Sequence, residues 1–313
     1  MMHKRVSLLV ASLGLTLGLT AQAPTDRDTT LLWSISGNDL TETSYLFGTI
    51  HMIPAEDFFM PKSVSVALAG SERVAFEVDM KEMQDPSLMF TIMGRLQMAN
   101  GEKFKDLVED DDYQLVKTYF DSTGVPFAMI EGWMPMFLSA LVGQDMEDMG
   151  CMGFGGLMGG DEGDLRSYEI ELTELADKGE KEIFGLETLE FQLAVFDSIP
   201  YEAQASMLVD AVKSDLSAEE DADNEFDKMV DMYRRQAISE MVDMISESAG
   251  EEGDSNFEEF LLVRRNRAWI PLMAEAMSGG AVFFAVGAAH LGGEDGVIKL
   301  LRDAGYQVEG VYE

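Results

Sequence analysis

Two histidines of this chain occupy the same short pattern, in which a glycine stands three positions before the histidine. His51 ends residues 48–51 (GTIH), His290 ends residues 287–290 (GAAH), and the third histidine, His3, lies near the N-terminus. Each pattern follows an apolar run of the kind that forms a buried strand. A histidine in that position is exposed at a sheet edge, where α/β proteins bind ligands. We therefore expect His51 and His290 to form two halves of one site.

A carboxylate is expected beside the two histidines. Residues 73–78 (RVAFEV) have the composition of another buried strand, and Glu77 and Asp79 lie at its end. Two imidazoles and one carboxylate are a suitable ligand set for Zn²⁺, Mn²⁺ or Co²⁺, with a position left for water. Without a metal, His51 paired with Glu77 could act as a general base. The alternative is that both histidines are structural and bond to backbone at their strand ends.

Arginines are clustered at residues 264–267 (RRNR) of a strongly acidic chain. Arg265 could bind a substrate carboxylate or phosphate in a bidentate manner, or could hold its own helix to the acidic body by an ion pair. Glu187 follows a further predicted strand, and it could reach the same site or begin the next helix. The sequence lacks the G-x-S-x-G, H-E-x-x-H and C-x-x-C motifs and the nucleotide-binding fingerprints.

These residues must be positioned by short apolar runs that alternate with longer amphipathic stretches. Apolar spacing predicts strands at residues 31–35, 44–50, 73–78, 182–186, 281–286 and 306–312, the first two joined as a hairpin around residues 37–39. It predicts helices at residues 61–69, 83–98, 111–120, 128–142, 169–176, 189–196, 201–212, 218–248, 257–277 and 294–304. Residues 143–163 are expected to form a loop rich in glycine and methionine. The resulting prediction is a single α+β domain over residues 30–313, with a central mixed sheet and a large helical insertion over residues 80–180.

Composition limits the partners and the compartment. The formal net charge of −36 makes nucleic acid and anionic membrane surfaces poor partners. Residues 1–21 have the pattern of a signal peptide, with Lys4 and Arg5 before an apolar run that is too short to span a membrane comfortably. We therefore expect an exported protein, periplasmic or extracellular, without stable membrane insertion. The single cysteine, Cys151, excludes an internal disulfide.

Several stretches of the chain, in a fixed order, carry a resemblance to a known family. They are Leu32-Trp33 with residues 44–51 (SYLFGTIH), residues 74–79 (VAFEVD), residues 183–200 (IFGLETLEFQLAVFDSIP), Arg265-Asn266 with Trp269, and residues 286–294 (VGAAHLGGE). On these residues the chain resembles the TraB/GumN (TraB/PrgY/GumN) family, which includes the Tiki-type metalloproteases, over roughly residues 31–313. There are departures: residues 167–169 read Ser-Tyr-Glu where the family usually has G-x-D, and Phe191 stands where it often has Glu.

The resemblance implies a fold akin to the erythromycin-esterase/ChaN-like group. For Tiki-type members it implies metal-dependent peptide cleavage through the two G-x-x-H motifs and a glutamate. Carried over to this chain, it implies that His51, His290 and Glu77 hold a divalent metal ion (Mn, Co or Zn), with Glu77, His51 and Arg265 acting in catalysis. The hypothesis is thus an exported metal-dependent hydrolase, a peptidase, acting on a peptide or small-molecule substrate. The alternatives are a protein that sequesters a peptide or small ligand without turnover, and a metal-free hydrolase that uses His51 and Glu77.

Overall fold

The computed structural model describes residues 30–79, 81, 94–139, 141–143, 165–217, 225–248 and 258–312. The predicted signal peptide at residues 1–21 lies outside the described residues. So do nearly all of the predicted loop at residues 143–163 and most of the predicted helix at residues 83–98.

A six-stranded mixed sheet forms the centre of the fold, in the order β6-β4-β7-β2-β1-β8. Strands β6, β4, β7 and β2 are parallel, whereas β1 runs antiparallel to both β2 and β8. The mixed α/β arrangement with a central mixed sheet is therefore as predicted. The strands are β1 (Leu32–Ser36), β2 (Ser44–Thr49), β4 (Arg73–Phe76), β6 (Glu182–Gly185), β7 (Val282–Gly287) and β8 (Gln307–Gly310).

The order of the strands differs from their order along the chain at one important place. Strand β7 comes from near the C-terminus, yet it lies between β2 and β4 and pairs with both. The hairpin of β1 and β2 closes as predicted through Gly37, Asn38 and Asp39, all with positive φ, and the Leu40 N–H donates to the Gly37 carbonyl. Glycine, asparagine and aspartate tolerate such a conformation better than other residues.

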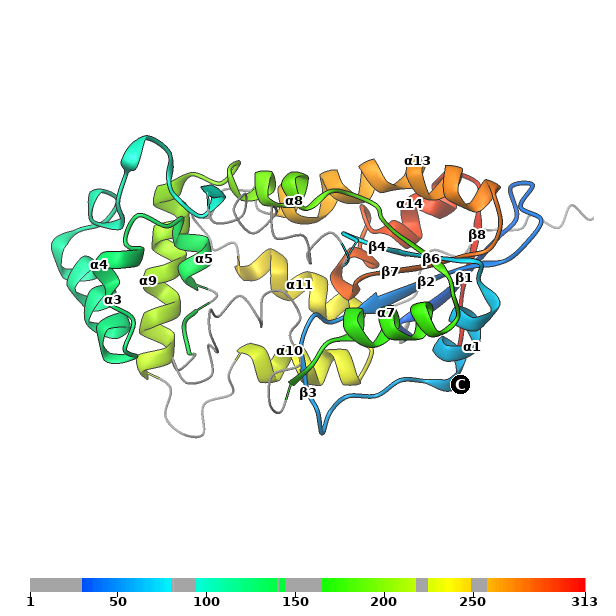
Figure 1. The fold of residues 1–313 in the computed structure, drawn as a ribbon, viewed down its shortest axis with the longest axis horizontal. Coiled ribbons are helices and arrows are strands. Elements are labelled where there is room, and N and C mark those ends of the chain that lie inside the picture. The colour runs from blue at the N-terminus through cyan, green and yellow to red at the C-terminus, as the bar shows by residue number, and fades with distance from the viewer. Residues whose placement is uncertain are drawn as a thin grey trace, which may run out of the picture.

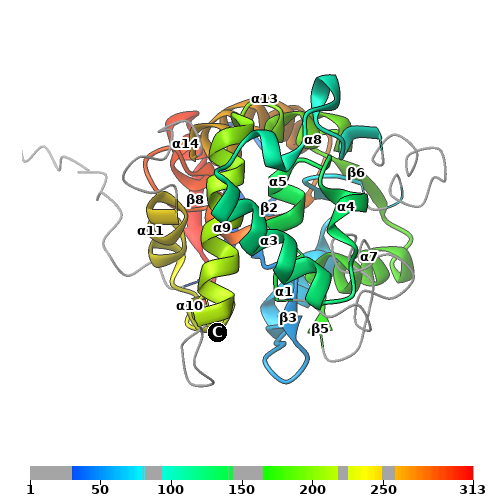
Figure 2. The same cartoon turned by 90° about the vertical axis from the view of Figure 1, so that its left-hand side faces the viewer.

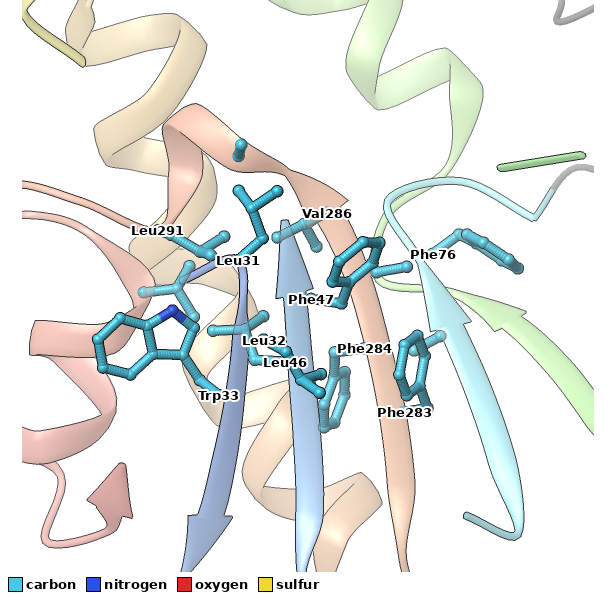
Figure 3. Packing of buried hydrophobic residues seen from close by; sticks show 14 of the residues in the cluster. Leu31, Leu32, Trp33, Leu46, Phe47, Phe76, Phe283, Phe284, Val286 and Leu291 are labelled. Atoms are coloured by element: carbon cyan, nitrogen blue, oxygen red, sulfur yellow. The ribbon is translucent and has the colours of Figure 1, made fainter. Parts of the chain in front are cut away.

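Helices cover both faces of the sheet. Figure 1 shows α13 (Arg264–Ser278) and α14 (Val297–Asp303) on one face, and α1 (Lys62–Gly70) and α7 (Tyr168–Lys178) on the other. Apolar side chains of the strands fill the space between these layers, as Figure 3 shows at close range. The largest of them are fully buried, and their burial is the main stabilising contribution to this part of the fold. They include Trp33, Phe47, Phe76, Phe283 and Phe284.

A second hydrophobic cluster lies in the helices beyond the C-terminal ends of the parallel strands (Figures 1 and 2). It packs around Phe104, Phe120 and Phe127 and takes in helix α9, which lies outside the predicted bounds 80–180. Those bounds stay a prediction. A smaller cluster includes Val78 and Leu193 and shares the neighbours Leu107 and Trp133 with the second cluster. The helices of this part are α3 (Asp110–Ser122), α4 (Phe127–Ile130), α5 (Pro135–Ser139), α8 (Leu189–Phe196) and α9 (Tyr201–Ser217).

Two predicted helices are each broken in the structure. The stretch 128–142 divides into α4 and α5, because Pro135 cannot continue a preceding helix and the Met134 N–H bonds instead to the Leu96 carbonyl. Residues 218–224 of the predicted helix 218–248 lie outside the described residues, and the rest divides into α10 (Glu225–Arg234) and α11 (Ile238–Ser248), with Gln236 between them in a left-handed conformation. The side chain of Gln236 accepts a hydrogen bond from the Leu31 N–H, which ties the break to the sheet.

The helices α10 and α11 each contact one of the histidine segments. The Tyr233 hydroxyl, from α10, donates to the Gly48 carbonyl at 3.0 Å. Ile238 and Val242, from α11, pack against Gly292, directly after the second histidine segment. Small elements complete the described chain: a two-stranded sheet of β3 (Ile53–Pro54) and β5 (Leu165–Arg166), and 3₁₀ turns at Ala99–Gly101, Phe104–Asp106 and Ala288–His290. Within the described ranges, every helix is too short or too polar to cross a lipid bilayer.

Gly48 explains why glycine begins the first histidine motif. A Cβ at this position would lie 3.0 Å from Ala288 Cα and 3.0 Å from Leu291 Cδ2, so the two histidine segments meet here without room for a side chain. We expect Gly48→Ala to lower the free energy of unfolding by about 1–3 kcal/mol, because overpacking against backbone forces the strand ends apart. Urea denaturation followed by circular dichroism measures this loss.

Gly70→Ala is the matched control, because nothing lies within 4 Å of a Cβ at that position. This variant should be as stable as the wild type or slightly more stable. Equal stability of the two variants would mean that the two histidine segments do not touch at Gly48.

Candidate functional site

Four neighbouring parallel strands each lead to a side chain that can do chemistry. Glu187 follows β6, Glu77 follows β4, His290 ends the 3₁₀ turn after β7, and His51 follows β2. Parallel strands end at the same edge of a sheet, so these four residues are brought to one edge, which we call the C-terminal edge. The backbone holds the strand ends in register: Thr49 pairs with Gly287, and the Glu187 N–H donates to the Glu77 carbonyl at 2.9 Å.

The guanidinium of Arg265, from helix α13, lies at the centre of this edge. Its Nη2 donates to Glu77 Oε2 at 2.5 Å and to Glu187 Oε1 at 2.6 Å, and its Nε also donates to Glu187. Its Nη1 lies 3.2 Å from His290 Nε2. The Arg265 side chain is only 7% exposed, so the pairs with both carboxylates are buried. Such charge-assisted hydrogen bonds are stronger than neutral ones.

The direction of Arg265 follows from the local winding of its helix. The turn Glu259–Val263, just before α13, is π-helical, and Arg265 Nη1 donates to the Leu261 carbonyl at 3.1 Å. A π-helical turn rotates the residues that follow it and is frequent at functional sites. From the other side, Trp269 Nε1 donates to Glu187 Oε2 at 3.1 Å and helps to fix that carboxylate.

Glu77 is buried and fully engaged in hydrogen bonds. Its Oε1 accepts from the Gly287 N–H at 2.7 Å, and its Oε2 accepts from Arg265 and from Gln192 Nε2 at 3.2 Å. Burial by itself would raise the pKa of Glu77, but the Arg265 guanidinium, with the charge of His51 and the Gly287 N–H, holds this pKa well below its usual range. Glu77 is therefore an ionised carboxylate at any physiological pH.

His290 is buried, and its hydrogen bonds indicate one tautomer. Its Nδ1 lies 2.6 Å from Asn266 Oδ1, and the Asn266 amide donates from Nδ2 to the Asp295 and His290 carbonyls. Since the amide oxygen can only accept, the proton is on Nδ1 and the lone pair of Nε2 faces Arg265. Burial lowers the pKa of His290 to about 3, with Arg265 acting in the same direction and Glu77 opposing it. The imidazole is therefore neutral.

His51 lies at the exposed rim of the same edge. Its side chain is 72% exposed, and its Nδ1 lies 3.2 Å from Glu169 Oε1 on helix α7. The Glu169 carboxylate raises the pKa of His51 to about 9. The charges of His51 and Arg265 both act on Glu77 and on His290, so all four groups belong to one electrostatic site.

The sequence of the chain that forms this site matches one protein family over almost its full length. The match is to the TraB/PrgY/gumN family and covers residues 31–310. The chain belongs to the TraB/PrgY/gumN family. The resemblance seen in the sequence motifs is thereby confirmed. No curated protein and no solved structure matches the sequence significantly. The likeness to the erythromycin-esterase/ChaN-like group therefore stays a prediction.

Three of the residues predicted for the site of this TraB/PrgY/gumN chain are in direct contact: Arg265, Glu77 and His290. The guanidinium forms ion pairs within the protein, which was one of its two predicted roles; its role toward a substrate stays a prediction. His51 reaches the same edge, but the expected pairing with Glu77 is replaced, because its Nδ1 faces Glu169. The alternative of a purely structural role had predicted hydrogen bonds from both histidines to the backbone. Instead, Nδ1 of each histidine faces a side-chain oxygen.

Sequence reasoning missed two partners of the histidines and one partner of Glu77. Glu169 was noted only as a departure from the family's usual aspartate, and Asn266 only as part of a motif. Gln192 had no predicted role. The available signal was the position of Asn266 beside Arg265 and the Ser167 helix cap that precedes Glu169. Neither signal indicates which face of the helix points to the histidines.

The side chains at the C-terminal edge are of types that bind divalent metal ions, namely imidazole and carboxylate. Glu77 Oε1 and His290 Nε2 lie 3.7 Å apart, whereas two ligand atoms of one ion with bonds of about 2.1 Å lie roughly 3.0–3.4 Å apart. The carboxylate is ionised and the imidazole neutral, as metal ligands must be. Within the described ranges, no group of three or more His, Cys, Asp or Glu side chains is already close enough to hold an ion. An ion would have to draw in His51 and take Nε2 of His290 from Arg265.

Proposed function

We propose that this protein is an exported, metal-dependent hydrolase that cleaves peptides, with His51, His290 and Glu77 as the ligands of a divalent ion. The observation that carries the proposal is the arrival of these three side chains at the ends of the adjacent strands β2, β7 and β4. Ligands of α/β proteins bind at such an edge. Membership of the TraB/PrgY/gumN family supports the same reading, and the choice of a peptide follows from the likeness to Tiki-type members.

The charge states at the edge suit the proposed chemistry. A bound divalent ion lowers the pKa of a coordinated water towards ~7 and can polarise a carbonyl. Glu77 is kept ionised by Arg265, and His290 is kept neutral by burial, so both are ready as ligands without losing a proton. Arg265, buried beside them, is the cation that can stabilise negative charge developing on a substrate carbonyl. His51 is exposed and marks the side from which a substrate arrives.

Metal uptake tests this function directly. Equilibrium dialysis of the purified protein against Co²⁺, Mn²⁺ or Zn²⁺ should give about one ion per chain, because three ligands and water complete such a site. We expect His51→Ala and His290→Ala each to lower this uptake by at least tenfold. Glu174→Gln is the control, since Glu174 is exposed, pairs with Lys178 and lies outside the proposed ligand set, so uptake should be unchanged.

Cleavage of a peptide library, followed by mass spectrometry, completes the test. Cleavage by the loaded wild type that disappears in both histidine variants supports a metal-dependent peptidase. A wild type that takes up none of the three ions overturns the proposal. An ion bound without any cleavage identifies a protein that sequesters its ligand.

A second function has one specific observation in its favour. His51 and Glu169 form an imidazole–carboxylate pair at the exposed rim, and such a pair can act as an oriented general base without a metal once His51 is neutral, above a pH of about 9. The carboxylate in this pair is Glu169, since Glu77 is engaged with Arg265. Peptide cleavage that survives EDTA and is lost in Glu169→Gln would favour this metal-free hydrolase.

A further inference from the structure

The two imidazoles of the site are held in the same way, by helices on opposite faces of the sheet. His51 Nδ1 lies 3.2 Å from Glu169 Oε1 on α7, and His290 Nδ1 lies 2.6 Å from Asn266 Oδ1 on α13. A neutral imidazole carries one proton, so a bond from Nδ1–H to an acceptor leaves the lone pair on Nε2. In their neutral forms both histidines thus carry the lone pair on Nε2, where that of His290 faces Arg265, although their Nδ1 partners come from different parts of the chain.

The carboxylate of Glu169 is itself fixed in place. Its Oε1 accepts from the Thr49 hydroxyl at 2.7 Å, and its Oε2 accepts from the Ser167 hydroxyl at 3.1 Å. Thr49 is the last residue of β2, two positions before His51, and Ser167 caps the start of α7. Glu169 therefore connects the end of the strand that carries His51 to the first turn of the helix beneath it. A carboxylate has no proton of its own at neutral pH, so it can only accept from His51.

We propose that Glu169 is the positioning residue of His51, holding the proton on Nδ1 so that Nε2 is presented to the ion, as Asn266 does for His290. This inference rests on the proposed function of the site. Outer carboxylates that accept from a ligating histidine fix its tautomer and ring orientation, and their loss weakens metal binding about 10- to 100-fold. Glu169 is not one of the proposed ligands, so it would act only through His51.

The test compares Glu169→Gln with Glu174→Gln, in a His3→Ala background that leaves two imidazoles in the chain. Both substitutions remove one negative charge from α7, but Glu174 is exposed and pairs with Lys178, one helical turn away. Long-range ¹H–¹⁵N spectra at pH 10 report which nitrogen of each imidazole carries the proton. In the parent and in Glu174→Gln, both histidines should be protonated on Nδ1. In Glu169→Gln, the His51 proton should shift towards Nε2 while the His290 signals stay unchanged.

Co²⁺ affinity provides the second readout. We expect Glu169→Gln to bind Co²⁺ about 10- to 100-fold more weakly than the parent, and Glu174→Gln to bind it as tightly as the parent. Thr49→Val removes one hydroxyl that holds Glu169 and keeps the carboxylate, so it should change the His51 signals in the same direction by a smaller amount. This variant decides the matter if circular dichroism shows that Glu169→Gln does not fold.

The two readouts separate the two proposals. If the His51 signals of Glu169→Gln match those of Glu174→Gln, Glu169 is not a positioning residue. If none of these proteins binds Co²⁺, Mn²⁺ or Zn²⁺, the metal-dependent function fails, while the spectra still show whether Glu169 sets the tautomer of His51. A changed tautomer with unchanged Co²⁺ affinity overturns the inference as stated.

Discussion

Arg265→Met is expected to lower the free energy of unfolding by about 3–5 kcal/mol, which is the usual cost of removing one partner of a buried ion pair. Methionine keeps an unbranched apolar stem but has no charge, so Glu77 and Glu187 would remain buried without their shared cation. The two carboxylates would then repel each other and lose the four hydrogen bonds that Arg265 Nε and Nη2 donate to them. Urea denaturation at pH 7, in the presence of EDTA, measures the loss.

Arg267→Met is the matched control on the same helix. Arg267 is exposed and forms a surface pair with Asp295, which typically contributes less than about 1 kcal/mol. In the Arg265→Met background, Glu77→Gln with Glu187→Gln should recover part of the stability, because the amides are neutral. Equal losses in the Arg265 and Arg267 variants would contradict a buried charge cluster at the C-terminal edge.

Acid should destabilise the protein through His290. The pKa of this histidine is about 3 in the folded state, against roughly 6.5 for an unperturbed histidine. Between these values the unfolded chain binds a proton that the folded chain does not, so the contribution is fully present above pH 6.5 and is lost as the pH falls. At about 1.4 kcal/mol per pH unit, with half that slope at pH 6.5 itself, we expect a loss of about 2 kcal/mol between pH 6.5 and 4.5.

The comparison with His290→Gln isolates this proton. Both proteins are denatured with urea in EDTA between pH 6.5 and 4.5, and the slopes of the unfolding free energy against pH are compared. The wild type should be steeper by about one proton, and contributions of carboxyl groups cancel in the difference. The raised pKa of His51 acts at the other end of the scale, since its contribution is lost as the pH rises through about 9. Identical slopes would mean that His290 is protonated in the folded protein.

The ends of the strands could be predicted from the sequence because the apolar runs that indicate them are local. Apolar runs end directly before Glu77 and shortly before His51 and His290, and parallel strands place such ends together. Arg265 was recognised because a cluster of arginines is unusual in so acidic a chain. Its ion pair was one of the two predicted roles, but its partners were not identified. Their positions depend on the contacts of Arg265 with the residues that follow β4 and β6, which come from distant parts of the chain.

The pairing of His51 with Glu169 could not be read from the sequence. Neighbouring residues of a helix point about 100° apart, so the face of α7 that meets the strand decides whether Glu169 or Glu171 reaches His51. The same holds for Asn266 on α13. The break at Gln236 could not be predicted either. Its left-handed residue accepts a hydrogen bond from the distant Leu31 N–H, and no local sequence pattern indicates that contact.

The place of β7 between β2 and β4 also determines when the site can exist during synthesis. Until β7 (Val282–Gly287) has been made, β2 and β4 have no strand to share, and Glu77 lacks the Gly287 N–H. A ribosome-bound chain that already contains His51 and Glu77 therefore has two unpaired apolar strand edges, which are the edges most prone to aggregation. The site can form only when nearly the whole chain has been translated, so a chain truncated before β7 would lack it.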